Sequence, residues 1–218
     1  MNRARLWLLV ELILILGVGI ADLYGFIFFS RTPYLIALGW LSLRLRGLRW
    51  RDLGFTRPPH WPRAIAIGAF AGVAMELFST FVTVPFFTRL TGKPPDLSDF
   101  RFMVGNLPVL LALLGVMWIL AAFGEELAHR GYVMNRVAEI GRGTRAAWLF
   151  SLIVSSAFFG WGHEAQDLTG VLQESFAGLL LGLMYLGSRR NLTIPIVAHG
   201  VSNTVAFILI YFGRYPGI

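Results

Sequence analysis

Apolar and polar segments alternate along the 218-residue chain in a regular way. A helix needs about 20 apolar residues to cross a bilayer, and most of the apolar runs approach that length. The run at 34–45 is short enough to be a re-entrant or interfacial piece. Residues 127–140 remain compatible with helix, which predicts a long fourth helix. We predict an all-α transmembrane bundle of about seven spans, at roughly 6–29, 34–45, 63–88, 106–126, 146–162, 169–187 and 194–212.

Composition supports a membrane protein. Apolar residues make up 56% of the chain and charged residues 14%, against about a quarter in soluble domains. These values exclude a soluble globular domain and a disordered chain. The absence of cysteine excludes a disulfide scaffold, a thiolate metal site and a cysteine nucleophile. No repeat or long linker divides the chain, so residues 1–218 are expected to form one integral membrane domain.

The net charge of +7 reflects membrane orientation rather than nucleic-acid binding, because the basic residues flank the apolar runs. Fourteen of the 19 lie in the N-terminal segment and in the second, fourth and sixth connecting segments, and five lie in the others. The positive-inside rule then predicts a cytoplasmic N-terminus and an outside C-terminus, in a bacterial or archaeal cell membrane. One loop carries most of this charge and can also contact anionic lipid headgroups: Arg44, Arg46, Arg49, Arg51, Arg57 and Arg63.

Ionisable residues inside apolar runs are costly in lipid and are therefore candidates for function. The candidates are Glu11, Asp22, Glu76, Glu125, Glu126, His129, Arg130, His163, Glu174 and His199. Helical i,i+4 spacing predicts that Glu126 pairs with Arg130, and that Glu125 faces His129 on another side of the helix. An ion-paired helix end explains the same residues without catalysis.

Two further sites follow downstream. His163 ends an apolar run, and the zinc-protease pattern fails there because position 167 is Asp. His199 and Asn203 lie four apart on one helix, where they could equally form a hydrogen-bonded bridge between helices. Together a carboxylate, two imidazoles and a carboxamide can supply a general base, an electrostatic partner and an oxyanion donor for amide hydrolysis.

The motifs Glu125-Glu126-x-x-x-Arg130, Phe159-x-x-x-His163 and His199-x-x-x-Asn203 resemble, in order, those of the CPBP family. This family, also called Abi, contains the CAAX prenyl proteases and bacteriocin-processing enzymes. The resemblance covers about residues 105–212, and the segment 50–55 is similar to one that precedes the family's core. It implies an intramembrane endopeptidase acting on a peptide, a prenylated protein or another membrane protein.

Carried over by motif, the resemblance implies that Glu125 activates water with His163, and that His199 and Asn203 stabilise the oxyanion. Glu126 and Arg130 would support the site. No cofactor is then required, although Glu125, His163 and His199 could equally hold zinc. The alternatives are a non-catalytic membrane scaffold of the same fold and a small transporter. The oligomeric state is not predicted.

Two features depart from the family's pattern. His129 stands where a bulky apolar residue is expected, and it can tune Glu125 or support the site. Simple alternation of the spans also puts Glu125 and His199 near the cytoplasmic side and His163 near the other. Convergence of these groups therefore requires that the fourth helix runs deeper than residue 126, or that Gly160 and Gly162 end the fifth helix inside the bundle.

Overall fold

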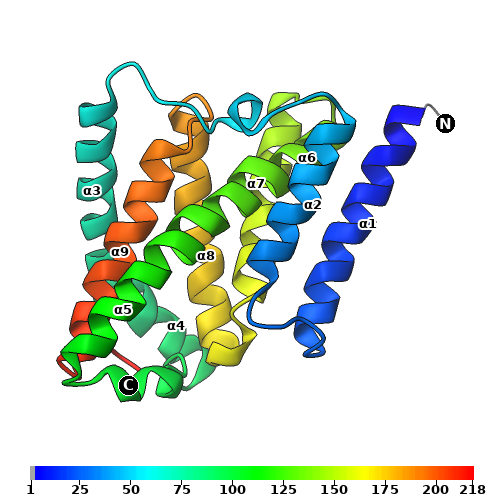
Figure 1. Cartoon of the computed structure of the whole chain (residues 1–218). Coiled ribbons are helices and arrows are strands. Elements are labelled where there is room, and N and C mark those ends of the chain that lie inside the picture. The colour runs from blue at the N-terminus through cyan, green and yellow to red at the C-terminus, as the bar shows by residue number, and fades with distance from the viewer. Residues whose placement is uncertain (1–2) are drawn as a thin grey trace.

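The computed structural model describes residues 3–218, with side chains from residue 5 onward, and these residues form a bundle of helices (Figure 1). Met1, Asn2 and the side chain of Arg3, which was counted among the N-terminal charges, lie outside the described residues. No strand occurs between residues 3 and 218. The predicted all-α architecture is confirmed.

Between residues 3 and 218, seven continuous helical segments correspond to the seven predicted runs. The first and second segments are α1 (Arg3–Leu23) and α2 (Arg31–Leu45). Two longer segments each contain a π-helix: α3 (Trp61–Phe78), η2 (Ser79–Thr83) and α4 (Val84–Thr91), then α5 (Leu107–Met117), η4 (Trp118–Val133) and α6 (Met134–Ile140). The last three are α7 (Arg145–Trp161), α8 (Asp167–Gly187) and α9 (Thr193–Tyr211). Single 3₁₀ turns occur at η1 (Trp50–Leu53), η3 (Ser98–Met103) and η5 (Glu164–Gln166).

Five of the segments are long and apolar enough to cross a membrane, by length and composition: Arg5–Leu23, Trp61–Thr91, Leu107–Ile140, Glu164–Gly187 and Thr193–Tyr211. The apolar helix α7 is shorter, at 17 residues, and α2 has 15. The outer faces of these helices carry many exposed large apolar side chains, which suits contact with lipid.

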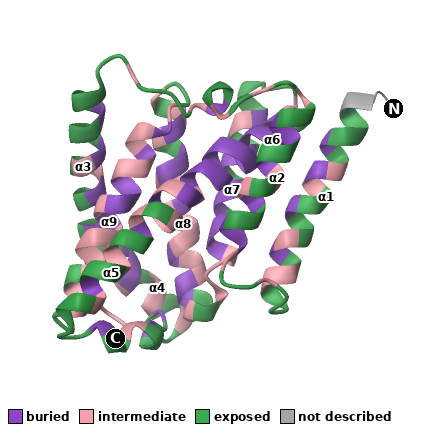
Figure 2. Cartoon of the chain, viewed as in Figure 1, coloured by how far each residue is buried: buried purple, intermediate pink, exposed green. Residues whose placement is uncertain are grey.

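The fourth segment is the centre of the bundle. Its apolar run ends at residue 126, whereas the helix continues to Ile140, 34 residues in all. Every residue from 126 to 138 is buried (Figure 2). Polar side chains are tolerated here because protein rather than lipid surrounds them. The predicted long fourth helix is confirmed, and Glu125 lies inside it rather than at its end.

Glycines allow the helices around this centre to approach closely. A Cβ atom on Gly72 of α3 would collide with the carbonyl oxygen of Ala198 in α9, and one on Gly160 of α7 would collide with the side chain of Ser175 in α8. Small residues at helix crossings are typical of membrane bundles, where packing replaces the hydrophobic effect. These contacts fix the positions of α7, whose C-terminal end carries the second motif, and of α9, which carries the third.

The two ends of the bundle differ in charge. One end carries the N-terminal end of α1, the α2–α3 loop and the α6–α7 and α8–α9 turns, and we call it the arginine-rich face (Figure 1). The other carries the α1–α2 loop, η3, the α7–α8 turn and the C-terminus, and we call it the C-terminal face. Exposed basic residues number ten on the first and four on the second: Arg5, Arg44, Arg49, Arg51, Arg57, Arg63, Arg142, Arg145, Arg189 and Arg190 against Arg89, Lys93, Arg101 and Arg214.

Candidate active site

The first motif lies on η4, which is wound as a π-helix. The amide of Met134 donates to the carbonyl of His129, an i→i+5 bond that widens the helix. The predicted pairing within this motif is confirmed, because Nη1 of Arg130 lies 2.7 Å from Oε1 of Glu126. Both side chains are completely enclosed, so the ion pair belongs to the protein interior.

Arg130 has further partners that hold it in place. Its Nη2 atom donates to the carbonyl of Gly178 in α8 at 2.9 Å, and its guanidinium lies over the ring of Phe159 in α7, 4.6 Å from the centroid. A Cβ atom on Gly178 would press against Phe159. The Arg130 side chain therefore joins η4 to both neighbouring helices. The second oxygen of Glu126, Oε2, is buried and has no hydrogen-bond partner among the described residues.

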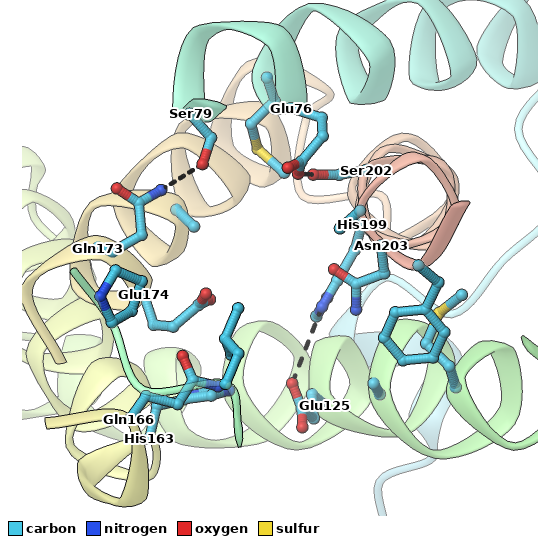
Figure 3. A pocket seen from close by; sticks show the side chains of 18 of the residues that line it. Glu76, Ser79, Glu125, His163, Gln166, Gln173, Glu174, His199, Ser202 and Asn203 are labelled. Atoms are coloured by element: carbon cyan, nitrogen blue, oxygen red, sulfur yellow. Dashed lines mark hydrogen bonds and ion pairs between the residues drawn. The ribbon is translucent and has the colours of Figure 1, made fainter. Parts of the chain in front are cut away.

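His199 connects α9 to the two glutamates of η4. Its Nδ1 atom lies 2.9 Å from Oε1 of Glu126, and its Nε2 atom lies 3.9 Å from Oε2 of Glu125 (Figure 3). Because Glu126 already accepts from Arg130, we assign the proton of this contact to Nδ1 of His199, which donates it. The Nε2 atom then faces Glu125 and the cavity beyond.

His163 lies in the turn that follows α7. The helix stops at Trp161, with Gly162 as its C-cap, and the chain turns so that Nδ1 of His163 lies 3.1 Å from the carbonyl oxygen of Phe159. Of the two ways in which the sequence allowed His163 to approach Glu125, the deeper fourth helix is observed, because that helix continues to Ile140. The fifth helix ends within one residue of its predicted boundary.

Arg31 stabilises the end of α7 from outside the motifs. Its Nη2 atom donates to the carbonyls of Phe158 at 2.6 Å and Phe159 at 3.0 Å, and the residue is 5% exposed. A Cβ atom at Gly162 would overlap the Arg31 guanidinium, so any larger residue there would displace the end of the Arg31 side chain. Arg31 and His163 thus share one carbonyl oxygen, that of Phe159.

One cavity of about 350 Å³ collects the predicted residues. Glu125 from η4, His163 from the α7–α8 turn, and His199 and Asn203 from α9 all line it (Figure 3). Glu126 and Arg130 lie behind this surface, in contact with it through His199. Three motifs that are far apart in sequence are therefore brought to one place. The pattern alone predicted the set of residues but not the shared cavity.

The expected contact between Glu125 and His129 does not form among the described residues, and that prediction was wrong. His129 is 1% exposed and packs against the rings of Phe158 and Phe159, at 5.6 and 5.1 Å between centroids. Its Nδ1 atom has no hydrogen-bond partner among the described residues. The i,i+4 spacing alone does not decide the pairing, because Glu126 and Arg130 meet at this spacing within the same π-helix, whereas the His129 ring is held by the aromatic rings of α7.

A zinc site does not fit this arrangement. Between residues 3 and 218, no three His, Asp or Glu side chains gather closely enough to hold a metal ion. Glu125, His163 and His199 share the cavity but do not converge as a ligand set. We therefore derive no catalytic step through a metal.

Sequence reasoning missed the opposite wall of the cavity. Glu76 of α3 accepts a hydrogen bond from Ser202 at 2.7 Å, and Glu174 of α8 points into the cavity (Figure 3). Both were singled out as ionisable residues in apolar runs but were assigned no role. Burial raises the pKa of the Tyr215 phenol well above its usual range, and the nearby Glu76 carboxylate adds to the shift. Tyr215 therefore remains protonated beside Glu76.

Gln173 of α8 completes this wall. Its Nε2 atom donates to Oγ of Ser79 at 2.7 Å, and its Oε1 atom accepts from Thr83 at 2.7 Å. These bonds tie α8 to η2. The lining includes three glutamates, and no lysine or arginine side chain from the described part of the chain. The cavity is consequently acidic.

Comparison with known proteins agrees with the three motifs. Residues 107–205 match the family model described as Type II CAAX prenyl endopeptidase Rce1-like, a range that contains every motif residue from Glu125 to Asn203. No curated protein and no solved structure matches the chain. The resemblance to the CAAX proteases is confirmed over residues 107–205, which are similar to the Rce1-like type II CAAX prenyl endopeptidases.

Proposed function

We propose that the protein is an intramembrane endopeptidase in which Glu125 activates the water that hydrolyses a peptide bond. The observation that carries the proposal is the convergence of Glu125, His163, His199 and Asn203, from three separate segments, on one cavity. A carboxylate facing two imidazoles and a carboxamide matches what amide hydrolysis requires. The family match supports peptidase activity in general.

In the first half of the reaction, water bound between Glu125 and His163 attacks the carbonyl carbon of the scissile bond. Glu125 takes a proton from the water, and Nε2 of His163 accepts the hydrogen bond that orients it. His163 can do this because Nδ1–H donates to the Phe159 carbonyl, leaving a lone pair on Nε2. The carbonyl oxygen becomes an oxyanion as the new carbon–oxygen bond forms.

In the second half, the carbon–nitrogen bond breaks and Glu125 returns its proton to the leaving amine. His199 acts here as an imidazolium with a proton on each ring nitrogen: Nδ1–H donates to Glu126, and Nε2–H donates to the oxyanion together with the carboxamide of Asn203. Glu126 orients His199 through Nδ1 at 2.9 Å, and Arg130 balances the charge of Glu126. The products are a new carboxylate and a free amine, so no cofactor is consumed.

The test is cleavage by the purified protein of a mixed peptide library and of a prenylated CAAX peptide with its unprenylated control, followed by mass spectrometry. Glu125→Gln should abolish cleavage while the protein remains folded in detergent. Glu139→Gln is the matched control, because Glu139 lies near the C-terminal end of the same continuous helix, where it pairs with Arg46 and Arg136. Cleavage by Glu125→Gln at the wild-type rate would overturn the role of Glu125. A folded wild-type protein that cleaves nothing would favour the non-catalytic scaffold.

A further inference from the structure

The catalytic cavity reaches only one face of the bundle. Its lining includes residues of the α1–α2 loop, the segment before η3, the α7–α8 turn and the C-terminal tail, all of which belong to the C-terminal face: Phe29, Ser30, Pro95, Leu97, Gln166 and Tyr215. None of the lining residues comes from the described loops of the arginine-rich face. Substrate therefore has a route to Glu125 from the C-terminal face.

Packed side chains close the other end. Between the Glu126–His199 contact and the arginine-rich face lies an apolar cluster that includes Leu127, Met134 and Leu192. Above it, Nδ2 of Asn135 donates to the Tyr185 hydroxyl at 2.9 Å, and that hydroxyl donates to the carbonyl of Leu53, also at 2.9 Å. This layer leaves no described opening from the arginine-rich face to the catalytic residues.

Charge assigns the two faces to opposite sides of a membrane. Ten exposed basic residues mark the closed end, and four mark the end where the cavity opens. Segments rich in arginine and lysine remain on the cytoplasmic side during insertion. These counts leave out the buried Arg31, Arg130 and Arg136, the partly exposed Arg46, and Arg3, whose side chain lies outside the described residues. The cavity mouth is thereby on the side away from the cytoplasm.

The rim of the mouth suits a polypeptide that emerges from a bilayer. Phe26, Phe28 and Phe29 of the α1–α2 loop are 82%, 86% and 71% exposed, and Phe29 also lines the cavity. Phe29 adopts a φ of 77°, a left-handed conformation that is rare for a bulky residue. The loop thus holds an aromatic side chain over the cavity entrance.

We propose that the cavity is loaded from the C-terminal face and takes an extracytoplasmic segment of a polypeptide, rather than the prenylated C-terminus of a cytoplasmic protein. That this segment is a substrate rests on the proposed function, whereas the route from the C-terminal face to Glu125 rests on the geometry of the cavity alone. The acidic lining of the cavity agrees with this substrate class. A free terminal carboxylate that entered the cavity would be repelled by three glutamates and would meet no lysine or arginine.

The absence of native cysteine makes the route directly measurable. Three single-cysteine variants of the full chain suffice: Ala206→Cys in the cavity, one turn beyond Asn203, Asp99→Cys on the C-terminal face and His60→Cys on the arginine-rich face. Each is treated with a small, membrane-impermeant cationic thiol reagent in intact bacterial cells and in inverted membrane vesicles. Labelling in detergent verifies that each cysteine is reactive when both sides are accessible.

The expected result is that Ala206→Cys and Asp99→Cys are labelled in intact cells and lose labelling in inverted vesicles, while His60→Cys does the reverse. Labelling of Ala206→Cys from the same side as His60→Cys would overturn the route. Labelling of both Ala206→Cys and Asp99→Cys from the cytoplasmic side would overturn the substrate class. Labelling of Ala206→Cys from neither side would overturn the inference that the cavity mouth is open to water. None of these readouts requires proteolysis, so failure of the proposed function would be seen separately, as correct labelling without cleavage.

Discussion

Nδ1 of His199 lies 2.9 Å from Oε1 of Glu126, the same oxygen that Arg130 binds at 2.7 Å. One carboxylate oxygen thus orients the imidazole and neutralises a buried guanidinium. The second member of the Glu125–Glu126 pair therefore has a positioning role, and its neighbour is left to face the cavity. Two adjacent glutamates with different surroundings can perform two different tasks.

This division of roles predicts different outcomes for two variants of Glu126. Glu126→Gln keeps an oxygen for His199 and should fold, with reduced kcat because the imidazole loses its charged partner. Both variants leave the Arg130 charge buried without its carboxylate partner, which typically costs about 3–5 kcal/mol, and Glu126→Ala also removes the hydrogen-bond acceptor. We therefore expect both variants to be less stable than the wild type, Glu126→Ala more so, as measured by thermal unfolding in detergent. Unfolding of both variants at the wild-type temperature would show that the ion pair contributes nothing to stability.

The Asn203 carboxamide lines the cavity beside His199 and is expected to act in the transition state. Removal of one oxyanion donor typically lowers the rate by about 10²–10³-fold, or about 3–4 kcal/mol. Asn203→Ala should therefore lower kcat with little change in KM or in thermal stability. A structural bridge between helices would instead be worth about 1 kcal/mol or less. Loss of stability with an unchanged kcat in the folded fraction would remove Asn203 from the mechanism.

Arg31 is expected to act on catalysis through His163. Arg31→Gln removes two charge-assisted hydrogen bonds to the end of α7, and a displacement of about 1 Å at a reacting group can cost about 10²-fold in rate. We expect a fall in kcat, partial recovery in Arg31→Lys and a shift of the His163 ring signals in NMR spectra. Arg46→Gln is the control, because it breaks ion pairs with Glu11 and Glu139 at the opposite end. Equal losses of kcat in Arg31→Gln and Arg46→Gln would indicate a general effect on folding.

Metal analysis tests the remaining alternative for the mechanism. Because the candidate ligands do not converge in the described part of the chain, we expect purified protein to contain well below one zinc per chain and to retain activity in chelator. The measurement is elemental analysis together with a chelator titration. One zinc per chain, with activity lost to chelator and restored by zinc, would contradict this expectation.

The bundle was predictable because long apolar runs report directly on spanning helices. The apolar run nevertheless ends at residue 126, because hydropathy cannot distinguish polar residues exposed to water from residues such as Arg130 and Asn135, whose partners are inside the protein. Burial of the helix as far as Ala138 depends on neighbours that are distant in sequence.

The site was predictable only in part. The motif residues from Glu125 to Asn203 could be singled out by type and spacing, but their common cavity depends on how α7 ends. Arg31 was counted as a loop charge, since nothing in its local sequence indicates that it binds carbonyls more than 120 residues away. Glu76 and Glu174 carried a signal, as ionisable residues in apolar runs, but their shared wall arises from tertiary packing.

The π-helical winding of η4 makes the number of residues as important as their identity. From Trp118 to Val133 the backbone bonds follow the i→i+5 pattern, so the segment holds more residues per turn than an α-helix. Deleting one residue between Trp118 and Glu125 would rotate Glu125 relative to the preceding helix, by somewhat less than the about 100° per residue of an α-helix, while leaving every motif side chain in the sequence. Such a variant would retain all three motifs and still aim its carboxylate away from His199. Length changes within this segment are therefore as informative about activity as substitutions of the glutamates themselves.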